Sequence, residues 1–190
     1  VILLFLQSQI GVSPAAIALI GGVVFLAVGG KKMVHVLEKV EWSTLLFFVG
    51  LFILVGSLEI TGVISGISGA IFGVVGSNTV LAVTLILWVS AFGSAFIDNI
   101  PFTAAFIPVL LEVPLDSGLQ LKPMIWALTL GAGLGGNGTI IGSSASIVAS
   151  GIAAAHGYPI SFKSYIRIGM TVMITTVAIA NVFLVLKLLV

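Results

Sequence analysis

Apolar residues run in long stretches along this chain and are interrupted by short polar or glycine-rich segments. The apolar runs cover 13–28, 43–58, 80–96, 102–111, 123–134, 144–155 and 166–189. A helix that crosses a membrane needs about 20 apolar residues. The pattern therefore predicts an all-α, multi-pass integral membrane protein with about six or seven crossings or half-crossings. Composition supports this class, because 59% of the 190 residues are hydrophobic and 7% are charged, against about a quarter charged in a soluble domain.

Residues 1–79 are expected to form scaffold helices and one interfacial helix. Ser13 and Pro14 suit an N-cap and a first helical residue, and Trp42 suits a membrane interface at the start of the next span. Glycine then recurs at three- and four-residue spacing, at Gly62, Gly66, Gly69, Gly73 and Gly76. On a helix these glycines form one stripe for close packing, and we expect segment 62–76 to lie along the interface rather than cross.

Residues 80–190 are expected to contain a hairpin, a broken helix and a last span. The apolar arms 80–96 and 102–111 are each short for a full crossing and are joined at Asp98-Asn99-Ile100-Pro101. A re-entrant helical hairpin fits these lengths if its tip is buried in protein or faces water. By the same argument, the runs 123–134 and 144–155 form one broken transmembrane helix. A loop at 156–167 and a span over about 166–189 complete the chain.

The basic residues predict an orientation. Five of the seven Lys and Arg residues lie in the segments 31–39 and 156–167. If 80–112 is a hairpin that enters and leaves from the outer side, both segments are cytoplasmic, as the positive-inside rule requires. If 80–112 were one full crossing, the two segments would face opposite sides. The charge pattern favours the hairpin, and the expected location is the cytoplasmic membrane.

Asp98 is the acidic residue expected at membrane depth, since the other five fall in loops or at helix ends. An ionised carboxylate in hydrocarbon costs at least a few kcal/mol, so Asp98 should be protonated, face water or bind a cation. These are also the working states of a proton- or sodium-coupled carrier. The alternative is that Asp98 and Asn99 only cap the second arm, with Pro101 in its first turn. Asn or Ser would serve that purpose without the cost of burial.

The glycine-rich break near 135–144 is the second polar interruption. A helix broken at membrane depth offers free N–H groups at one end and free carbonyls at the other. The expected substrate or ion site joins the hairpin tip to this break and comprises Asp98, Asn99, Thr103, Asn137, Gly138, Thr139, Ser143 and Ser144. A sodium ion, if bound, is expected near Asp98 and Asn137. The glycines are expected to let backbone approach a ligand and adopt positive φ; the structural alternative is a kink with tight helix crossing.

Other signals predict structure rather than chemistry. Gly131–Gly136 match a dinucleotide-binding pattern, but no acidic residue follows about 20 positions later. His35 and His156 have no metal-ligand spacing, and no nucleophile is paired with a base. We therefore expect no enzyme activity, no cofactor and no nucleic-acid partner. Asn181 is expected to hydrogen-bond between helices, and Ser77-Asn78-Thr79 to cap the first hairpin arm.

Three ordered motifs resemble one transporter superfamily. They are Glu41-Trp-Ser-Thr-Leu-Leu-Phe-Phe-Val-Gly-Leu-Phe, Asp98-Asn99-Ile-Pro101-Phe-Thr and Gly135-Gly-Asn-Gly-Thr-Ile-Ile-Gly-Ser-Ser-Ala-Ser. Together they resemble the C-terminal half of the ion transporter superfamily, in the branch of arsenite permeases, sodium/proton antiporters and P-protein-like carriers. The resemblance implies two inverted-topology repeats, an elevator motion and a homodimer in the lipid bilayer. Residues 1–190 would be the second repeat, and the chain, which lacks an initiator Met, is expected to miss its first half.

We accordingly predict a secondary active transporter that exchanges protons for a small inorganic ion or neutral oxyacid. Arsenite or antimonite export and sodium/proton antiport are the two leading forms, with Asp98 as the coupling carboxylate. A dicarboxylate or anion symporter of the same superfamily is an alternative, although that branch carries Ser-Asn-Thr at its hairpin tips and Asp98 would repel an anion. An ion channel is a further alternative, against which the paired breaks argue.

Overall fold

The computed structural model describes residues 11–29, 38, 40, 42–113 and 117–189. These residues form helices, turns and loops with no strand, as hydropathy predicts. The chain divides into two compact units, 1–46 and 47–190. The expected cytoplasmic cations Lys31, Lys32 and Lys39, together with His35, lie outside the described residues.

The first two helices begin at the residues that sequence indicates. α3 (Pro14–Gly29) starts after Ser13, whose Oγ accepts a hydrogen bond from the Ala16 backbone N–H at 3.2 Å. α5 (Trp42–Ile60) starts at the interfacial tryptophan. The N-cap at Ser13 and the start of the following helix at Trp42 are thus confirmed.

α6 (Val63–Val75) follows α5 after a sharp bend. The two helices meet at 69°. Gly62 makes the turn with φ of 76°, a conformation that costs glycine little and other residues more. α6 turns Ile64, Ser68 and Phe72 into the core, and the glycine stripe occupies a different face.

The glycine stripe of α6 does not pack against the described part of this chain. A Cβ built at Gly66, Gly69 or Gly73 would meet nothing within 4 Å. The close helix packing expected of this stripe is therefore absent among the described residues.

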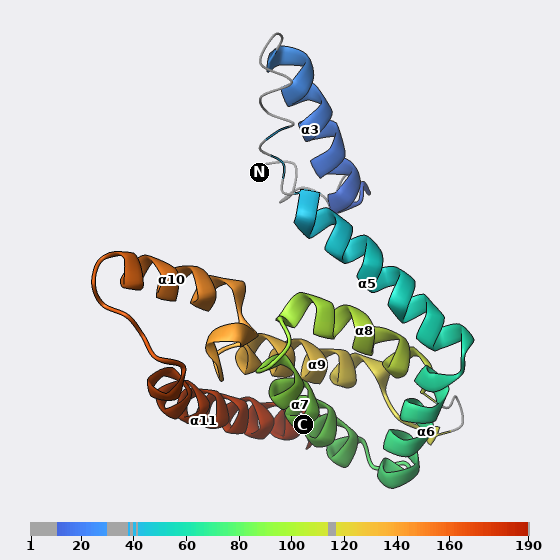
Figure 1. The fold of residues 1–190 in the computed structure, drawn as a ribbon. Coiled ribbons are helices and arrows are strands. Elements are labelled where there is room, and N and C mark those ends of the chain that lie inside the picture. The colour runs from blue at the N-terminus through green and yellow to red at the C-terminus, as the bar shows by residue number, and fades with distance from the viewer. Residues whose placement is uncertain (1–10, 30–37, 39, 41, 114–116, 190) are drawn as a thin grey trace. The chain divides into compact units, whose positions relative to one another are not determined.

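Three helices form the core of the second unit. α7 (Thr79–Ser94), α9 (Leu121–Gly135) and α11 (Phe162–Leu189) lie side by side (Figure 1). The fully buried side chains between them include Ile86, Leu87, Leu128, Met173 and Val177. The expected interhelical bond of Asn181 is confirmed, because Thr84 Oγ1 on α7 donates to Asn181 Oδ1 on α11 at 3.1 Å.

α7 and α9 are so close that two positions of α9 admit only glycine. A Cβ at Gly131 would collide with the Leu87 carbonyl oxygen, and one at Gly135 with the Ala91 carbonyl oxygen. Ser94 Oγ donates to the Ala132 carbonyl at 2.7 Å across the same contact. Tight helix crossing, the structural alternative for the glycines of the break, is therefore observed at Gly135, and Gly131 packs in the same way.

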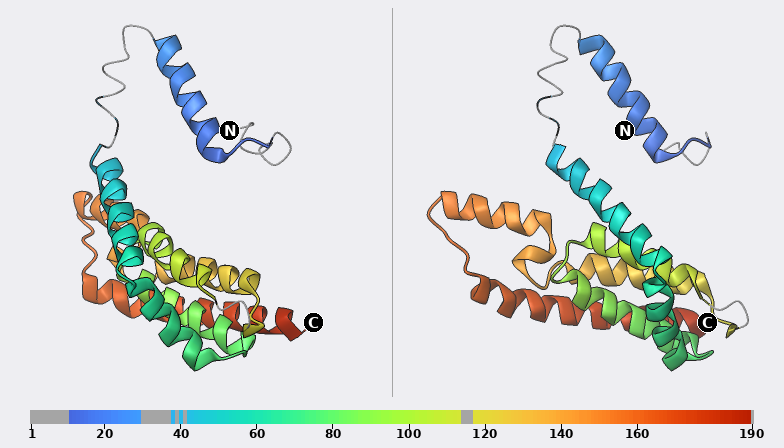
Figure 2. Two further views of the ribbon diagram at one scale, coloured as in Figure 1. Left: turned by 90° about the vertical axis from the view of Figure 1, so that its right-hand side faces the viewer. Right: turned by 45° about the vertical axis from the view of Figure 1, so that its right-hand side comes forward.

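α7 and α8 (Asn99–Leu111) form a helical hairpin (Figure 2). Its first arm is capped as expected, with Asn78 Oδ1 accepting from the Leu81 N–H at 3.1 Å. Both outer ends of the hairpin lie beside α6: α7 follows it directly, and Glu112, after α8, accepts at Oε1 a hydrogen bond of 2.8 Å from Ser65 Oγ. The tip, around Asp98, therefore lies at the far end from α6.

The two runs expected to form a broken helix are each helical, with a short 3-10 helix between them. α9 ends at Gly135, a short 3-10 helix η3 covers Ile140–Gly142, and α10 (Ser144–Ala155) follows. None of the residues of α10 is buried, and it stands apart from the three-helix core in Figures 1 and 2.

The last helix begins earlier than hydropathy predicts. α11 starts at Phe162, not near 166, because Ser161 Oγ accepts the Ser164 N–H at 3.2 Å and acts as an N-cap. Lys163 and Arg167, expected in a loop, therefore lie on this helix. The second half of the expected loop 156–167 is therefore helical.

One described helix is long and apolar enough to cross a membrane alone, at Phe162–Leu188 of α11. Leu45–Ile60 of α5 and Val63–Val75 of α6 meet the same criterion together, as a bent pair. The remaining apolar helices are α3, α7, α8 and α10, with 16 or fewer residues each. About 16 residues of helix span about 24 Å, less than the roughly 30 Å of a hydrocarbon core.

The contact between α7 and α9 gives a first testable prediction. Gly135→Ala should lower the stability of the full-length transporter by about 1–3 kcal/mol, because the new methyl group overlaps the Ala91 backbone. The measurement is the unfolding temperature in detergent.

Gly133→Ala on the same helix is the matched control. Its Cβ would meet nothing within 4 Å, and alanine favours helix over glycine by about 1 kcal/mol. Equal destabilisation by both substitutions would contradict the packing assigned to Gly135.

Candidate functional site

The fold brings the hairpin tip and the helix break into contact. The carbonyl oxygens of Ser94 and Ala95, at the end of α7, lie 2.9 and 2.7 Å from where a Cβ of Gly142 would stand. A Cβ at Gly138 would likewise meet the Ala95 side chain at 3.0 Å. The two polar interruptions of the sequence, some forty residues apart, thus form one surface.

Thr139 joins the two interruptions with its hydroxyl group. This side chain is fully buried. Its Oγ1 donates a short hydrogen bond to the Ala95 carbonyl and accepts the Gly142 N–H at 3.1 Å. The hydroxyl of Thr139 therefore has both a donor and an acceptor partner within the protein, and it holds the break on the hairpin.

The carboxylate of Asp98 makes the second connection between the hairpin tip and the break. Its Oδ1 accepts the Ile100 N–H at 3.2 Å, which caps α8. Its Oδ2 accepts the Ser144 N–H at 3.2 Å and a short hydrogen bond from the Ser144 hydroxyl. One carboxylate thus serves the first turns of α8 and α10 together.

The capping of α10 comes from the hairpin instead of the local sequence. Ser143 occupies the N-cap position of α10, but its side chain makes no capping hydrogen bond. Asp98 supplies the acceptor to the first helical N–H, at Ser144. Because helix N-termini carry partial positive charge, two of them favour an ionised carboxylate between them. Asp98 is half-buried and Ser144 is exposed, so this pair is accessible at the surface of the chain.

The glycines of the break serve close packing, not unusual backbone conformation. Gly135, Gly136, Gly138 and Gly142 are all absent from the positive-φ glycines of the chain. The expectation of positive φ at the break is therefore wrong. The backbone needs these glycines because a Cβ at Gly136 would stand 2.9 Å from the Gly142 carbonyl oxygen, and at Gly138 2.8 Å from Met173 Sδ.

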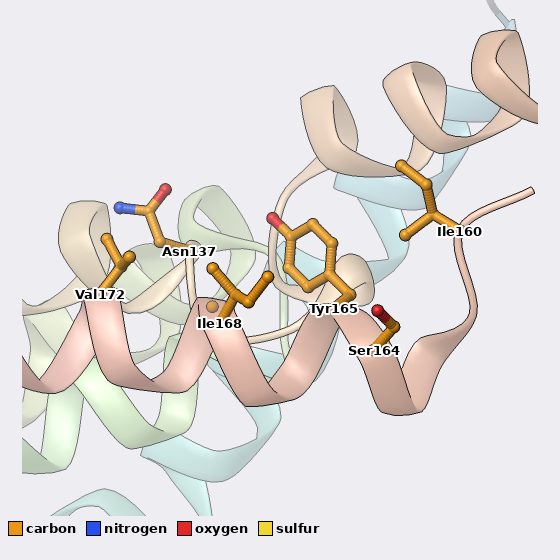
Figure 3. Close-up of a pocket in the computed structure, with 7 residues that line it drawn as sticks. Asn137, Ile160, Ser164, Tyr165, Ile168 and Val172 are labelled. Atoms are coloured by element: carbon orange, nitrogen blue, oxygen red, sulfur yellow. The ribbon is translucent and has the colours of Figure 1, made fainter. Parts of the chain in front are cut away.

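Asn137 lines a cavity in which Asp98 takes no part. A cavity of about 330 Å³ lies between the break and the first turns of α11, lined by Asn137, Ser164, Tyr165 and apolar neighbours (Figure 3). In Figure 3 the Asn137 amide and the Tyr165 ring rise on the same side of α11. Tyr165 also ties α11 to α10, because its hydroxyl oxygen lies 2.9 Å from Ser146 Oγ.

The remaining predicted site residues take separate places. Asn99 is the first residue of α8 and is half-buried. Thr103, one turn later, lines an apolar cavity of about 150 Å³ between α8 and α9 with Thr129. The structure therefore brings Asp98 and Ser144 into contact, whereas Asn137 and Thr103 each line a cavity that includes neither of them.

Sequence analysis overlooked three residues that position the site. Ser94 ties α7 to α9 before the break, and Tyr165 ties α11 to α10 after it, each through its hydroxyl group. Gly169 on α11 lets the break approach, since its Cβ would stand 2.9 Å from the Gly138 carbonyl oxygen. Ser94 and Gly169 had a signal, a small residue inside an apolar run; Tyr165 was hidden by its assignment to a loop.

The family profile for the citrate transporter matches residues 1–131, more than half of the chain. The chain belongs to this family. The members of this family are transporters. No solved structure matches the chain.

Curated relatives support the same assignment. An uncharacterized transporter of Mycobacterium tuberculosis is 43% identical over 175 residues, which cover 91% of this chain and 41% of the relative. One from Synechocystis is 33% identical over 192 residues, covering 90% and 43%. The human P protein is 42% identical over 164 residues, covering 78% and 19%. The chain thus spans about two fifths of the bacterial relatives that it matches.

Thr139 provides the second prediction. Thr139→Val keeps the shape of the side chain but leaves the buried Ala95 carbonyl and Gly142 N–H without their partner. Stability of the full-length transporter should fall by about 1–3 kcal/mol, measured as unfolding temperature in detergent. Thr139→Ser keeps the hydroxyl and should retain most of the stability; a valine variant as stable as the serine variant would contradict this role.

Proposed function

We propose that the chain forms the transport-site half of a secondary active transporter that exchanges protons for a small inorganic ion or neutral oxyacid. The single observation that supports this most is the position of Asp98 between the first turns of α8 and α10. In this proposal the hairpin is re-entrant, α9 and α10 are the halves of one broken transmembrane helix, and the chain is the second of two inverted repeats in a homodimer.

Asp98 is proposed as the coupling carboxylate. When ionised, it accepts one hydrogen bond from α8 and two from Ser144. A proton on Oδ2 would occupy the oxygen that Ser144 needs and would loosen the hairpin from α10. A cation bound there would compete with the same hydroxyl group. Proton and cation therefore act on one contact that links two moving parts, which is what an exchanger requires.

The ligands for a transported ion are proposed to be oxygen atoms of the tip and the break. Ser144 Oγ and the Asp98 carboxylate are in contact, and the adjoining Ser143 and Asn99 add neutral polar groups. Sodium prefers such hard oxygen ligands, and a neutral oxyacid such as arsenite needs only donors and acceptors. Among the described residues, no group of three or more His, Asp or Glu side chains gathers as a metal site.

Citrate is the second candidate substrate, and the family description favours it. Helix N-termini are ready anion sites, and two of them meet at Asp98. The carboxylate of Asp98 already occupies both, so an anionic substrate would have to displace it or arrive when it is protonated. Proton-coupled anion symport would follow from the second case.

The third prediction separates these functions. In everted vesicles that contain the full-length transporter, a pH-sensitive dye should report proton movement on addition of one solute among sodium, lithium, arsenite and citrate. Exchange for a cation or oxyacid moves protons out of the vesicles as the added solute enters, whereas symport carries protons in with citrate. The two move the dye signal in opposite directions. Asp98→Asn should abolish the response, because the amide cannot exchange a proton.

Glu112→Gln is the matched control. It removes the same charge at the other end of α8. Within the described part of the chain, the Glu112 carboxylate accepts a hydrogen bond from Ser65. This variant should leave the response intact. An unchanged response in Asp98→Asn would reduce Asp98 to a helix cap and refute the proposed mechanism.

A further inference from the structure

A groove between α9 and α11 lies at the opposite end of the core from the break. Its volume is about 470 Å³. Trp126, Phe183 and Leu184 form apolar walls, while Lys122 and Lys187 lie along it with Gln120. None of the residues that line the groove is acidic.

The two lysines of this groove are the two basic residues that lie outside the segments expected in the cytoplasm. The other five basic residues fall in the segments expected in the cytoplasm. Lys122 and Lys187 are 65 positions apart in the sequence, yet the fold places them in one groove. Lys187 lies above the Phe183 ring, with Nζ 6.0 Å from its centroid, a distance at which cation–π attraction holds a side chain in place.

The distance of the groove from the break matches the distance from the midplane of a bilayer to its headgroups. Lys122 precedes Gly135, the last residue of α9, by 13 positions, which is about 20 Å along a helix. Half of a bilayer with its headgroups is also about 20–22 Å thick. If the break lies near the midplane, as the proposed function requires, Lys122 lies at the level of the phosphates. Trp126, one turn deeper, then lies where interfacial tryptophan is enriched.

We propose that this groove binds an anionic phospholipid from the outer leaflet. The phosphate is held between Lys122 and Lys187, and an acyl chain lies against Trp126, Phe183 and Leu184. Charge complementarity selects this occupant, because an apolar partner helix would leave two lysines uncompensated, and a soluble anion would leave the apolar walls uncovered. The depth argument and the choice of leaflet rest on the proposed function; the groove and its charges do not.

Native mass spectrometry of the full-length transporter in detergent tests this proposal. Phosphatidylglycerol and phosphatidylcholine with identical acyl chains are titrated, and the bound fraction of each is measured. Wild type should retain phosphatidylglycerol preferentially. A lysine near a membrane surface contributes attraction equivalent to about fivefold in affinity, so Lys122→Gln with Lys187→Gln should weaken phosphatidylglycerol binding about 30-fold. Phosphatidylcholine binding should change little.

Lys163→Gln with Arg167→Gln is the matched control. It removes the same charge from exposed positions at the other end of α11 and should leave the lipid preference unchanged. Lys122→Arg with Lys187→Arg should retain the preference, and Trp126→Ala should weaken both lipids. The proposal fails if the two charge-removing double variants weaken phosphatidylglycerol binding equally, because the attraction is then unspecific. It also fails if Lys122→Gln with Lys187→Gln has no effect, because another part of the transporter then covers the groove. Neither result depends on transport, so each is separable from the role of Asp98.

Discussion

The contact on which the rest of the structure depends is the close approach of the α7 and α9 backbones. It exists because Gly131 and Gly135 have no side chain where the carbonyl oxygens of Leu87 and Ala91 stand. This approach carries the end of α9 to the end of α7, and the break therefore begins beside the hairpin tip. Small residues at helix contacts are the usual means of association where lipid offers no hydrophobic drive between helices. Here they also determine where the polar site forms.

At that point two kinds of connection hold the break, and they differ in what can change them. Thr139 binds through a neutral, fully buried hydroxyl group that nothing titrates. Asp98 binds through a carboxylate that is half-buried, next to an exposed Ser144. The first connection is suited to permanence and the second to exchange with protons or ions. The proposed function uses both, because the site must keep its shape while one contact opens.

Hydropathy and capping residues predicted most elements: the start of α3 at Ser13, both arms of the hairpin, and the helices on either side of the glycine-rich break. They missed the start of α11, because Ser161 caps a first turn that is too polar to register as apolar. Sequence analysis also predicted positive φ for the glycines of the break. A glycine that is needed because another segment packs against it looks the same in sequence as one that is needed for a positive φ. The pairing of Asp98 with Ser144 was within reach because both were polar at membrane depth. The separate cavity of Asn137 was not, because it depends on the close approach of the Asn137 backbone to Gly169 of α11.

Under the proposed function, the charge around Asp98 limits what the site can carry. Two helix N-termini supply about half a positive charge each, so an ionised Asp98 leaves the site close to neutral. Residues 94–103 and 135–146 contain no Lys, Arg or His, and no further positive charge is available from the tip or the break. Replacing a proton by sodium keeps this balance, and a neutral oxyacid does not disturb it. Citrate would add negative charge without compensation from these segments, so a citrate carrier built on this site has to bring cations with its substrate or draw positive charge from the rest of the transporter.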